Sequence, residues 1–405
     1  MSTSAPYCDL INHTRADWDQ LFLHFNPTQV IDNLRHELYV GASNKVPVNA
    51  GLSAPSRDFY YLIRPLLPRT LRIQLQRIYF RGWDKIPFPR WPLDVTVEDL
   101  FERLLFLSMK AAGIEAIPFI WFWPHGASSA TIMTHDVETA PGRDFSPRLM
   151  DIDESFGLRS SFQIVPEQRY NVPPSFLAEI QARGHVINVH DLNHDGRLFR
   201  NQAEFQSRVK LINKYGRAWG ARGFRSGVLY RNLDWYDQLE FEYDMSVPNV
   251  GHLDPQRGGC CTVFPYFIGD ILELPITTIQ DYSLFHILRD YSLDLWKAQA
   301  ASVEAKHGLL SFITHPDYLR EKGALRTYRA LLTFLCQCRE ERGMWITTAD
   351  EVNKWWRERT DMMLICRDGE WRIEGAGKER AQIAYARLLR DTIVYTRSAN
   401  AVARI

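Results

Sequence analysis

Short apolar runs alternate with longer amphipathic stretches between about residue 128 and residue 350 of this chain. The apolar runs are rich in Ile, Val, Leu and Phe, which is typical of strands buried in a parallel sheet. The pattern predicts eight strands, at residues 130–134, 161–165, 185–189, 222–225, 241–244, 271–274, 309–313 and 344–347.

Amphipathic helices are expected between most of these strands. Segment 199–215 shows the helical period that buries one face of a helix. Its recurring apolar side chains are Phe199, Phe205, Val209 and Ile212. Similar patterns cover residues 174–183, 284–306 and 325–342. Repeated strand–helix units of this kind predict an α/β protein with a (β/α) barrel, either complete or distorted to seven strands.

Two flanking regions complete the expected organisation. Residues 1–127 are predicted to be mainly helical, with a helix start at Thr96, and residues 128–358 are predicted to form the barrel. Residues 359–405 are predicted to form a small module of two strands and a helix. The turn between its strands is expected at Asp368-Gly369, a pair that favours tight hairpin turns.

The longest apolar stretch runs from residue 104 to residue 123. Lys110, Glu115 and Pro118 interrupt it, and a lone transmembrane helix would have to bury these residues at considerable cost. We therefore expect a helix, a turn and a strand in this stretch.

The composition is that of an ordinary globular protein. Hydrophobic residues make up 45% of the chain and charged residues 24%, which argues against disorder. The 48 Lys and Arg residues balance 48 Asp and Glu residues, so no global charge draws the chain to nucleic acid. The cysteines form no paired CxxC motif for zinc and are expected to be reduced.

The chain start and one basic segment bear on location. The first ten residues lack the basic start and apolar stretch of a secretory signal, so we expect a cytoplasmic protein. Segment 59–83 contains arginines at positions 64, 69, 72, 77 and 81 and no acid. A basic amphipathic helix of this kind can lie on the anionic inner face of a membrane. It can equally pack on the rest of the protein, with the arginine stems covering apolar neighbours.

Polar residues directly follow four of the predicted strands. In a parallel barrel the catalytic groups gather at the C-terminal ends of the strands, so these positions are candidates for chemistry. They are Thr134–Glu138, His190–His194, Gly223–Gly227 and Thr314–Asp317.

The spacing of His190 and His194 indicates a metal centre when a carboxylate is added, because histidines four apart can aim both imidazoles the same way. Two histidines and one carboxylate leave positions open on a divalent ion, as in a catalytic zinc site. Such an ion polarises a carbonyl and acidifies its bound water, and a second carboxylate can take the proton. The sequence therefore predicts hydrolysis assisted by Zn²⁺ or another divalent transition metal.

The order of these motifs resembles the polysaccharide deacetylase family, the carbohydrate esterases with a NodB homology domain. Members carry an Asp-containing strand end, an HxxxH pair, an Arg motif, a second Asp-containing strand and a late strand ending in His. The corresponding segments here are Thr134–Glu138, His190–His194, Arg225–Gly227, Tyr243–Ser246 and Phe312–His315. The resemblance covers about residues 120–350.

The resemblance implies roles for individual residues. Asp136 would be the catalytic base and His315 the catalytic acid. The metal ligands would be Glu138, His190 and His194. Val137 separates the two carboxylates here, whereas the family commonly has adjacent Asp residues.

Two further residues would support the catalytic pair. Arg225 would keep Asp136 in place and ionised, since a nearby cation favours the carboxylate. Asp244 would orient His315 and keep it protonated. Gly227 stands where the family usually has Pro, which is expected to loosen the loop around Arg225.

Four polar neighbours have alternative interpretations. His135 is expected to make local hydrogen bonds. Asp191 and Asp195 could orient the histidines or cap the following helix. Glu273 could pair with Arg225, line the site, or form an ion pair inside the barrel.

Together, the residues and the resemblance predict a metal-dependent hydrolase that removes an N-acetyl group from a sugar. The sugar would belong to a glycan, a lipid-linked saccharide or a glycosylated metabolite. One alternative keeps the chemistry but has a non-sugar amide, a formamide or a cyclic amide as substrate. The other is a non-catalytic carbohydrate-binding or scaffold protein, which the departures at Glu138 and Gly227 suggest.

Overall fold

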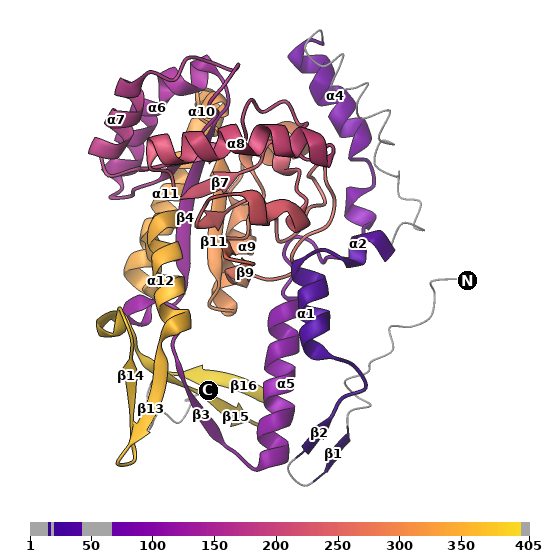
Figure 1. Ribbon diagram of the computed structural model, residues 1–405, viewed down its shortest axis with the longest axis vertical. Coiled ribbons are helices and arrows are strands. Elements are labelled where there is room, and N and C mark those ends of the chain that lie inside the picture. The colour runs from indigo at the N-terminus through magenta and orange to yellow at the C-terminus, as the bar shows by residue number, and fades with distance from the viewer. Residues whose placement is uncertain (1–14, 18–19, 43–66, 398–405) are drawn as a thin grey trace.

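A curled, mostly parallel sheet forms the centre of the molecule. The computed structural model describes residues 15–17, 20–42 and 67–397 (Figure 1). The sheet has the strand order β11-β4-β5-β6-β7-β8-β10-β9, with β12 also paired to β4. Its strands are β4 (Ala130–Val137), β5 (Ser161–Ile164), β6 (Val186–His190), β7 (Gly223–Arg225), β8 (Tyr243–Asp244), β9 (Tyr266–Ile268), β10 (Ile271–Glu273), β11 (Leu309–Thr314) and β12 (Trp345–Thr347).

The eight predicted strands are confirmed, and the distorted barrel that they were expected to form is confirmed with them. The sheet is distorted because β10 and β11 are not paired by a ladder. Side chains bridge this opening instead: the Thr277 hydroxyl donates to the carbonyl of Leu309 at 2.7 Å and accepts from the Ser311 N–H at 2.9 Å. The Thr278 hydroxyl donates to the carbonyl of Ser311 at 2.9 Å. Hydroxyl groups of the segment that follows β10 thus connect this segment to β11 across the opening.

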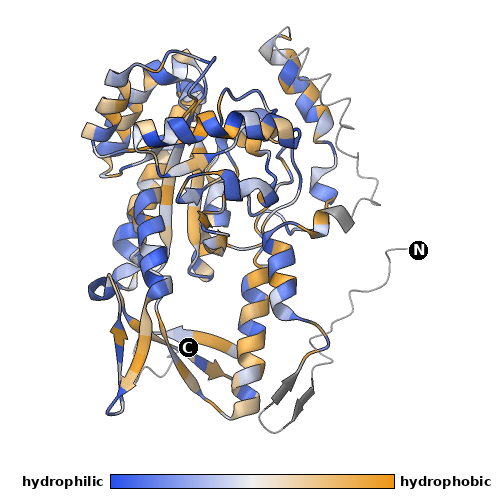
Figure 2. Cartoon of the chain, viewed as in Figure 1, coloured by the Kyte–Doolittle hydropathy of each residue, from blue (hydrophilic) through white to orange (hydrophobic). Residues whose placement is uncertain are grey.

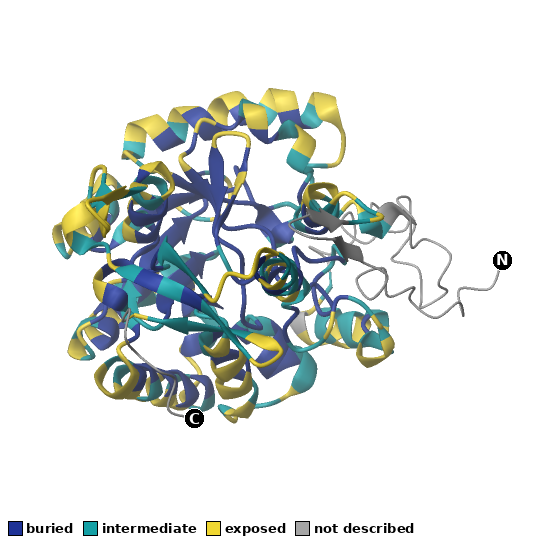
Figure 3. Ribbon diagram, turned by 90° about the horizontal axis from the view of Figure 1, so that it is seen from below, coloured by how far each residue is buried: buried dark blue, intermediate teal, exposed yellow. Residues whose placement is uncertain are grey.

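Helices surround this sheet (Figures 2 and 3). Apolar side chains of the helices and of the sheet pack together in shared core clusters. They are α6 (Ala140–Ser155), α7 (Pro174–Ala182), α8 (Gln202–Trp219), α9 (Asp294–Ala305), α10 (Pro316–Leu319), α11 (Lys322–Arg342) and α12 (Ala349–Asp361). Short 3-10 turns are η3 (Pro124–Gly126), η4 (Gly227–Leu229) and η5 (Leu233–Gln238).

The single helix expected at residues 284–306 is wrong. A short π-helix, η6 (Ser283–Leu288), ends at Arg289, and α9 begins only at Asp294. Arg289 has a φ of 59°, in the left-handed region that ends a right-handed helix. The Asp290 side chain then accepts a hydrogen bond from the Ser292 N–H at 2.7 Å, which turns the chain before α9.

The N-terminal region is mainly helical in its described part, as expected. Its elements are β1 (Arg15–Asp17), β2 (Gln20–Phe22), α1 (Pro27–Arg35), α2 (Tyr39–Ala42), α4 (Arg69–Tyr79), η2 (Trp83–Lys85), α5 (Thr96–Ala112) and β3 (Ala116–Ile120). The helix, turn and strand expected between residues 104 and 123 are α5, its left-handed cap Gly113, and β3. Residues 59–66 of the basic segment lie outside the described residues.

The C-terminal residues form strands where a helix was expected. The predicted hairpin is confirmed as β13 (Met363–Arg367) and β14 (Glu370–Glu374), around Asp368-Gly369. A short turn, η7 (Lys378–Arg380), then leads to β15 (Ile383–Leu389) and β16 (Thr392–Thr396). The expected helix is wrong because β15 alternates half-buried and buried positions at its start, and because β16, its hairpin partner, is rich in β-branched residues. β15 pairs antiparallel with β3, so the two flanking regions share one sheet.

A buried carboxyl group anchors α5 against the barrel. Glu98, in the first turn of α5, is 6% exposed and accepts hydrogen bonds from the Thr262 hydroxyl and from the Val263 N–H. Its second oxygen has no partner among the described residues. Burial raises the pKa of Glu98 to about 7, although the hydrogen bonds from residues 262 and 263 oppose this shift.

We expect Glu98→Gln to flatten the dependence of stability on pH. The folded-state pKa of about 7 lies above the ordinary value of 4.5, so the stability that Glu98 contributes is present below pH 4.5 and lost as pH rises through 7. A shift of this size corresponds to up to about 3 kcal/mol of unfolding free energy. Urea unfolding at pH 5, 6, 7 and 8 measures the loss, with the exposed Glu341→Gln as control. Parallel curves for the native protein and Glu98→Gln would contradict the expectation.

Candidate active site

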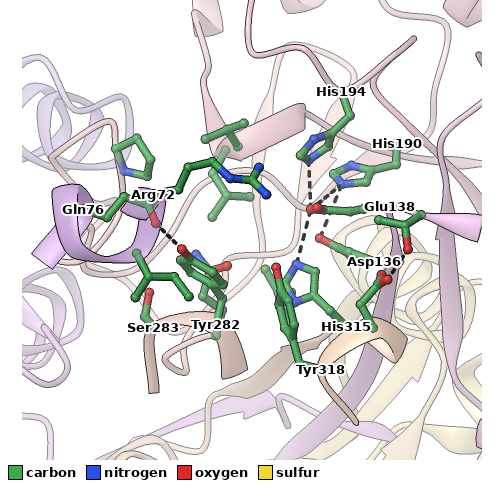
Figure 4. Close-up of a pocket in the computed structure, with 18 of the residues that line it drawn as sticks. Arg72, Gln76, Asp136, Glu138, His190, His194, Tyr282, Ser283, His315 and Tyr318 are labelled. Carbon is green, nitrogen blue, oxygen red and sulfur yellow. Dashed lines mark hydrogen bonds and ion pairs between the residues drawn. The ribbon is translucent and has the colours of Figure 1, made fainter. Parts of the chain in front are cut away.

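The strand ends converge on one cavity. Asp136 lies near the end of β4, His190 ends β6, and His315 directly follows β11. These side chains, together with Glu138 and His194, line a cavity of about 320 Å³ (Figure 4). The sheet therefore brings five of the candidate residues together, because the carboxyl ends of its parallel strands share one edge.

His190 directs its Nε2 at two carboxylates. Its Nδ1 lies 3.1 Å from the carbonyl oxygen of Arg225 and must donate to it, since a carbonyl only accepts. With a proton on Nδ1, Nε2 is the ring atom that can bind a metal ion, and it has no hydrogen-bond partner among the described residues. That atom faces Asp136 Oδ2 at 3.6 Å and Glu138 Oε1 at 4.0 Å. A lone pair directed at two acceptors favours a cation between them.

Glu138, His190 and His194 fit a divalent metal ion. One ligand atom from each can be chosen so that all three lie within 4.8 Å of one another. His194 Nε2 is 3.0 Å from Glu138 Oε1. Burial would raise the pKa of Glu138, but the charge of His194 and hydrogen bonds from the surrounding histidines hold it well below its usual range. Two imidazoles and one ionised carboxylate form a donor set that suits zinc with positions left open.

Asp136 is ionised beside a buried cation. Arg225 is fully buried, and its Nη1 donates to Asp136 Oδ1 at 2.5 Å and to the Thr134 hydroxyl at 2.8 Å. Its Nε donates to the carbonyl of Met245 at 2.9 Å. Burial would raise the pKa of Asp136, but the charge of Arg225 brings the pKa below its ordinary value. This geometry places Arg225 where the sequence resemblance requires it.

Asp281, rather than Asp244, orients His315. Asp281 Oδ1 lies 2.6 Å from His315 Nδ1, and its Oδ2 accepts from the His315 backbone N–H at 2.7 Å. Burial would lower the pKa of His315, but the charge of Asp281 and its hydrogen bond raise it well above the ordinary value. The His315 Nε2 faces Glu138 Oε1 at 3.4 Å, on the side of the cavity. Asp281 lies eight residues beyond the end of β10, too far for inspection of strand ends to have identified it.

The expectation for Asp244 is therefore wrong. Its carboxylate accepts hydrogen bonds from the Ser246 backbone N–H and hydroxyl and from Tyr236. Glu273 lies against it and accepts from the Val247 N–H at 2.9 Å. Burial raises the pKa of both carboxyl groups, and the charge of Asp244 raises that of Glu273 further. Glu273 thus forms an acid pair inside the barrel, where an ion pair with Arg225 was one of the expected possibilities.

His135 makes the local hydrogen bonds that were expected. Its Nδ1 lies 2.8 Å from the Thr314 hydroxyl and its Nε2 2.8 Å from Asp153 Oδ2. The Tyr328 hydroxyl also donates to Asp153, at 2.6 Å. The network joins β4 to β11 through His135 and Thr314. These two residues directly precede the candidate catalytic residues Asp136 and His315.

The two acidic neighbours of the histidines have other partners. Asp191 accepts from the Leu192 N–H at 2.6 Å, and Asp195 accepts from Arg208. The N-cap of α8 is Asn201. Hence the structure gives neither acid the helix-capping role that was considered.

Gly227 is required by close packing. A Cβ at this position would lie 2.4 Å from Asp191 Oδ2 and 3.3 Å from the Cα of His194. The expectation that Gly227 loosens the loop is wrong, because the absence of a side chain lets the Arg225 loop approach the metal-ligand loop.

No family model matches the chain, and no curated protein matches it. Solved structures do match. A Mycobacterium smegmatis protein described as a polysaccharide deacetylase is 18% identical, with a TM-score of 0.50, over 60% of this chain and 94% of that one. The chain has the polysaccharide deacetylase fold. An allantoinase structure is 12% identical with a TM-score of 0.46, over 58% of this chain and 92% of its own. A chitin deacetylase from Colletotrichum lindemuthianum is 14% identical with a TM-score of 0.36, over 58% of this chain and 89% of that one.

Zinc is expected to bind and stabilise this polysaccharide deacetylase fold through His194. Adding Zn²⁺ to metal-free protein should raise the melting temperature, because the ion binds only the folded ligand set. His194→Ala should weaken binding by about 100-fold, since it removes one of three ligands. Scanning calorimetry measures the melting temperature and titration calorimetry measures the zinc affinity. His24→Ala is the matched exposed control. Equal zinc affinity in all three proteins would contradict the assignment.

Proposed function

We propose that this protein is a metal-dependent hydrolase that removes the N-acetyl group from a sugar. The sugar belongs to a glycan, a lipid-linked saccharide or a glycosylated metabolite. The observation that carries the proposal is the Nε2 of His190, which has no hydrogen-bond partner among the described residues. It faces Asp136 and Glu138 in a cavity that His315 also lines. The fold is consistent with this chemistry.

The roles of the residues follow from their contacts. A divalent ion held by Glu138, His190 and His194 would polarise the acetamide carbonyl. Asp136, kept ionised by Arg225, takes a proton from the attacking water. The water oxygen bonds to the carbonyl carbon as the carbon–nitrogen bond breaks.

His315, which lies beside Glu138, supplies the acid. His315, held protonated by Asp281, directs its Nε2 toward the cavity and can give its proton to the departing amine. Acetate and the free amine are the products. Asp281 acts as a positioning residue, because it fixes the ring through both its side-chain and backbone contacts.

Loss of the base should abolish turnover. In zinc-loaded protein we expect Asp136→Ala to lower acetate release by about 10²- to 10⁴-fold, since a general base contributes that much. The measurement is freed acetate from a panel of N-acetyl sugar nucleotides and lipid-linked saccharides. Asp144→Ala is the control, because Asp144 is an exposed partner of Arg143 on α6.

The same panel separates the alternatives. Hydrolysis of a formamide or a cyclic amide without turnover of any acetylated sugar would favour the non-sugar amide hydrolase. Binding of a saccharide with no product from any compound would favour the scaffold protein and contradict the proposal.

We propose in addition that α4 contacts an anionic membrane surface from its outer face. None of the described helices is long and apolar enough to cross a membrane. Leu71, Leu75 and Ile78 form an exposed apolar stripe on α4, with exposed fractions of 45%, 38% and 55%. The opposite face packs on the barrel, where Arg77 Nε donates to the carbonyl of His286 at 2.9 Å. The exposed Arg81 and the lack of acid in segment 59–83 supply the complementary charge.

Polar substitution of the stripe should release the protein from vesicles. Leu71→Gln combined with Ile78→Gln is expected to lower binding to anionic vesicles by about tenfold or more, because each buried aliphatic side chain contributes about 1.5–3 kcal/mol. Flotation with anionic and neutral vesicles measures this. Leu211→Gln, at an exposed leucine of α8, is the matched control. Flotation that is independent of anionic lipid would remove the membrane proposal.

A further inference from the structure

A helix from outside the barrel forms one wall of the catalytic cavity. Arg72, Ile73 and Gln76 of α4 line the same cavity as the catalytic residues (Figure 4). The wall is fixed to the barrel, because the Tyr282 hydroxyl donates to the Gln76 side chain and Arg77 donates to the η6 backbone. A ligand that fills the cavity would therefore contact α4.

The acids that line the cavity have partners of their own. Asp136 pairs with Arg225, and Glu138 faces the histidine pair. Asp317 accepts a hydrogen bond from the Thr139 hydroxyl. Among the described residues, none of these carboxylates forms an ion pair with an arginine that lines the cavity, so those arginines are not required to neutralise them.

Three arginines line the cavity: Arg72, Arg169 and Arg320. The guanidinium of Arg72 extends into the cavity toward His194 and Glu138 (Figure 4). Its Nε is buried and has no hydrogen-bond partner among the described residues. The Nε of Arg169 donates a hydrogen bond to the backbone carbonyl of Glu138 at 3.0 Å. A buried donor without a partner is costly unless a ligand satisfies it.

We propose that the substrate carries a phosphate or diphosphate beside its acetylated sugar, and that Arg72 binds this group. The inference rests on the proposed function and narrows its substrate class. A guanidinium matches the oxygens of a phosphate with paired hydrogen bonds. Arg169 and Arg320, both exposed, add positive charge around the same cavity, which suits a diphosphate better than a single carboxylate.

Turnover by the zinc-loaded enzyme tests the substrate class. The substrates are N-acetylglucosamine, its 1-phosphate, its uridine diphosphate conjugate and a short polyprenyl diphosphate conjugate. We expect Arg72→Gln to lower kcat/KM for the phosphorylated substrates by about tenfold or more beyond any loss that it causes for the neutral sugar. The last two substrates distinguish a nucleotide-borne from a lipid-borne diphosphate. An equal loss for neutral and phosphorylated substrates would overturn the inference and leave the deacetylase function standing.

A binding measurement keeps the inference testable if no sugar is turned over. Pyrophosphate is titrated into the zinc-loaded protein and into Arg72→Gln, Arg72→Lys and Arg81→Gln. The dissociation constant should rise about tenfold in Arg72→Gln, rise less in Arg72→Lys, and stay unchanged in Arg81→Gln, whose exposed arginine lies outside the cavity. Equal affinity in all four proteins would show binding at the metal alone and would overturn the inference. Melting temperatures verify that each variant is folded.

Discussion

The hydrogen bond from His190 Nδ1 to the carbonyl oxygen of Arg225 determines what the cavity can do. It fixes the tautomer, so the remaining nitrogen is an electron-pair donor pointing at two carboxylates. The side chain of Arg225 also stabilises the ionised form of one of those carboxylates, Asp136. Since β6 and β7 pair His190 with Arg225 in register, the parallel sheet itself couples the proposed metal ligand His190 to the proposed base Asp136.

The strands and most of the site were predictable because both depend on local signals. Eight short apolar runs are continuous in the sequence, and polar residues follow directly where they end. Asp136, His190, His194 and His315 therefore emerge from inspection of strand ends alone. The family resemblance then suggested which of these residues would act as base, acid and metal ligands.

The remaining features depend on contacts that no local pattern encodes. Asp281 reaches His315 from another loop of the barrel, so choosing it over Asp244 required the geometry of two strand ends. The break at Arg289 arises from one left-handed residue between two segments with helical periodicity. Gly227 looked permissive in sequence, and only the approach of Asp191 reveals that it is required.

The pairing of β3 with β15 has a consequence for how the protein is made. β3 precedes the first barrel strand, whereas β15 is among the last elements of the chain. During synthesis β3 leaves the ribosome long before its partner exists, so the edge that pairs with β15 stays open until every barrel strand has been made. The sheet that joins the two flanking regions can therefore form only after the whole barrel has been synthesised.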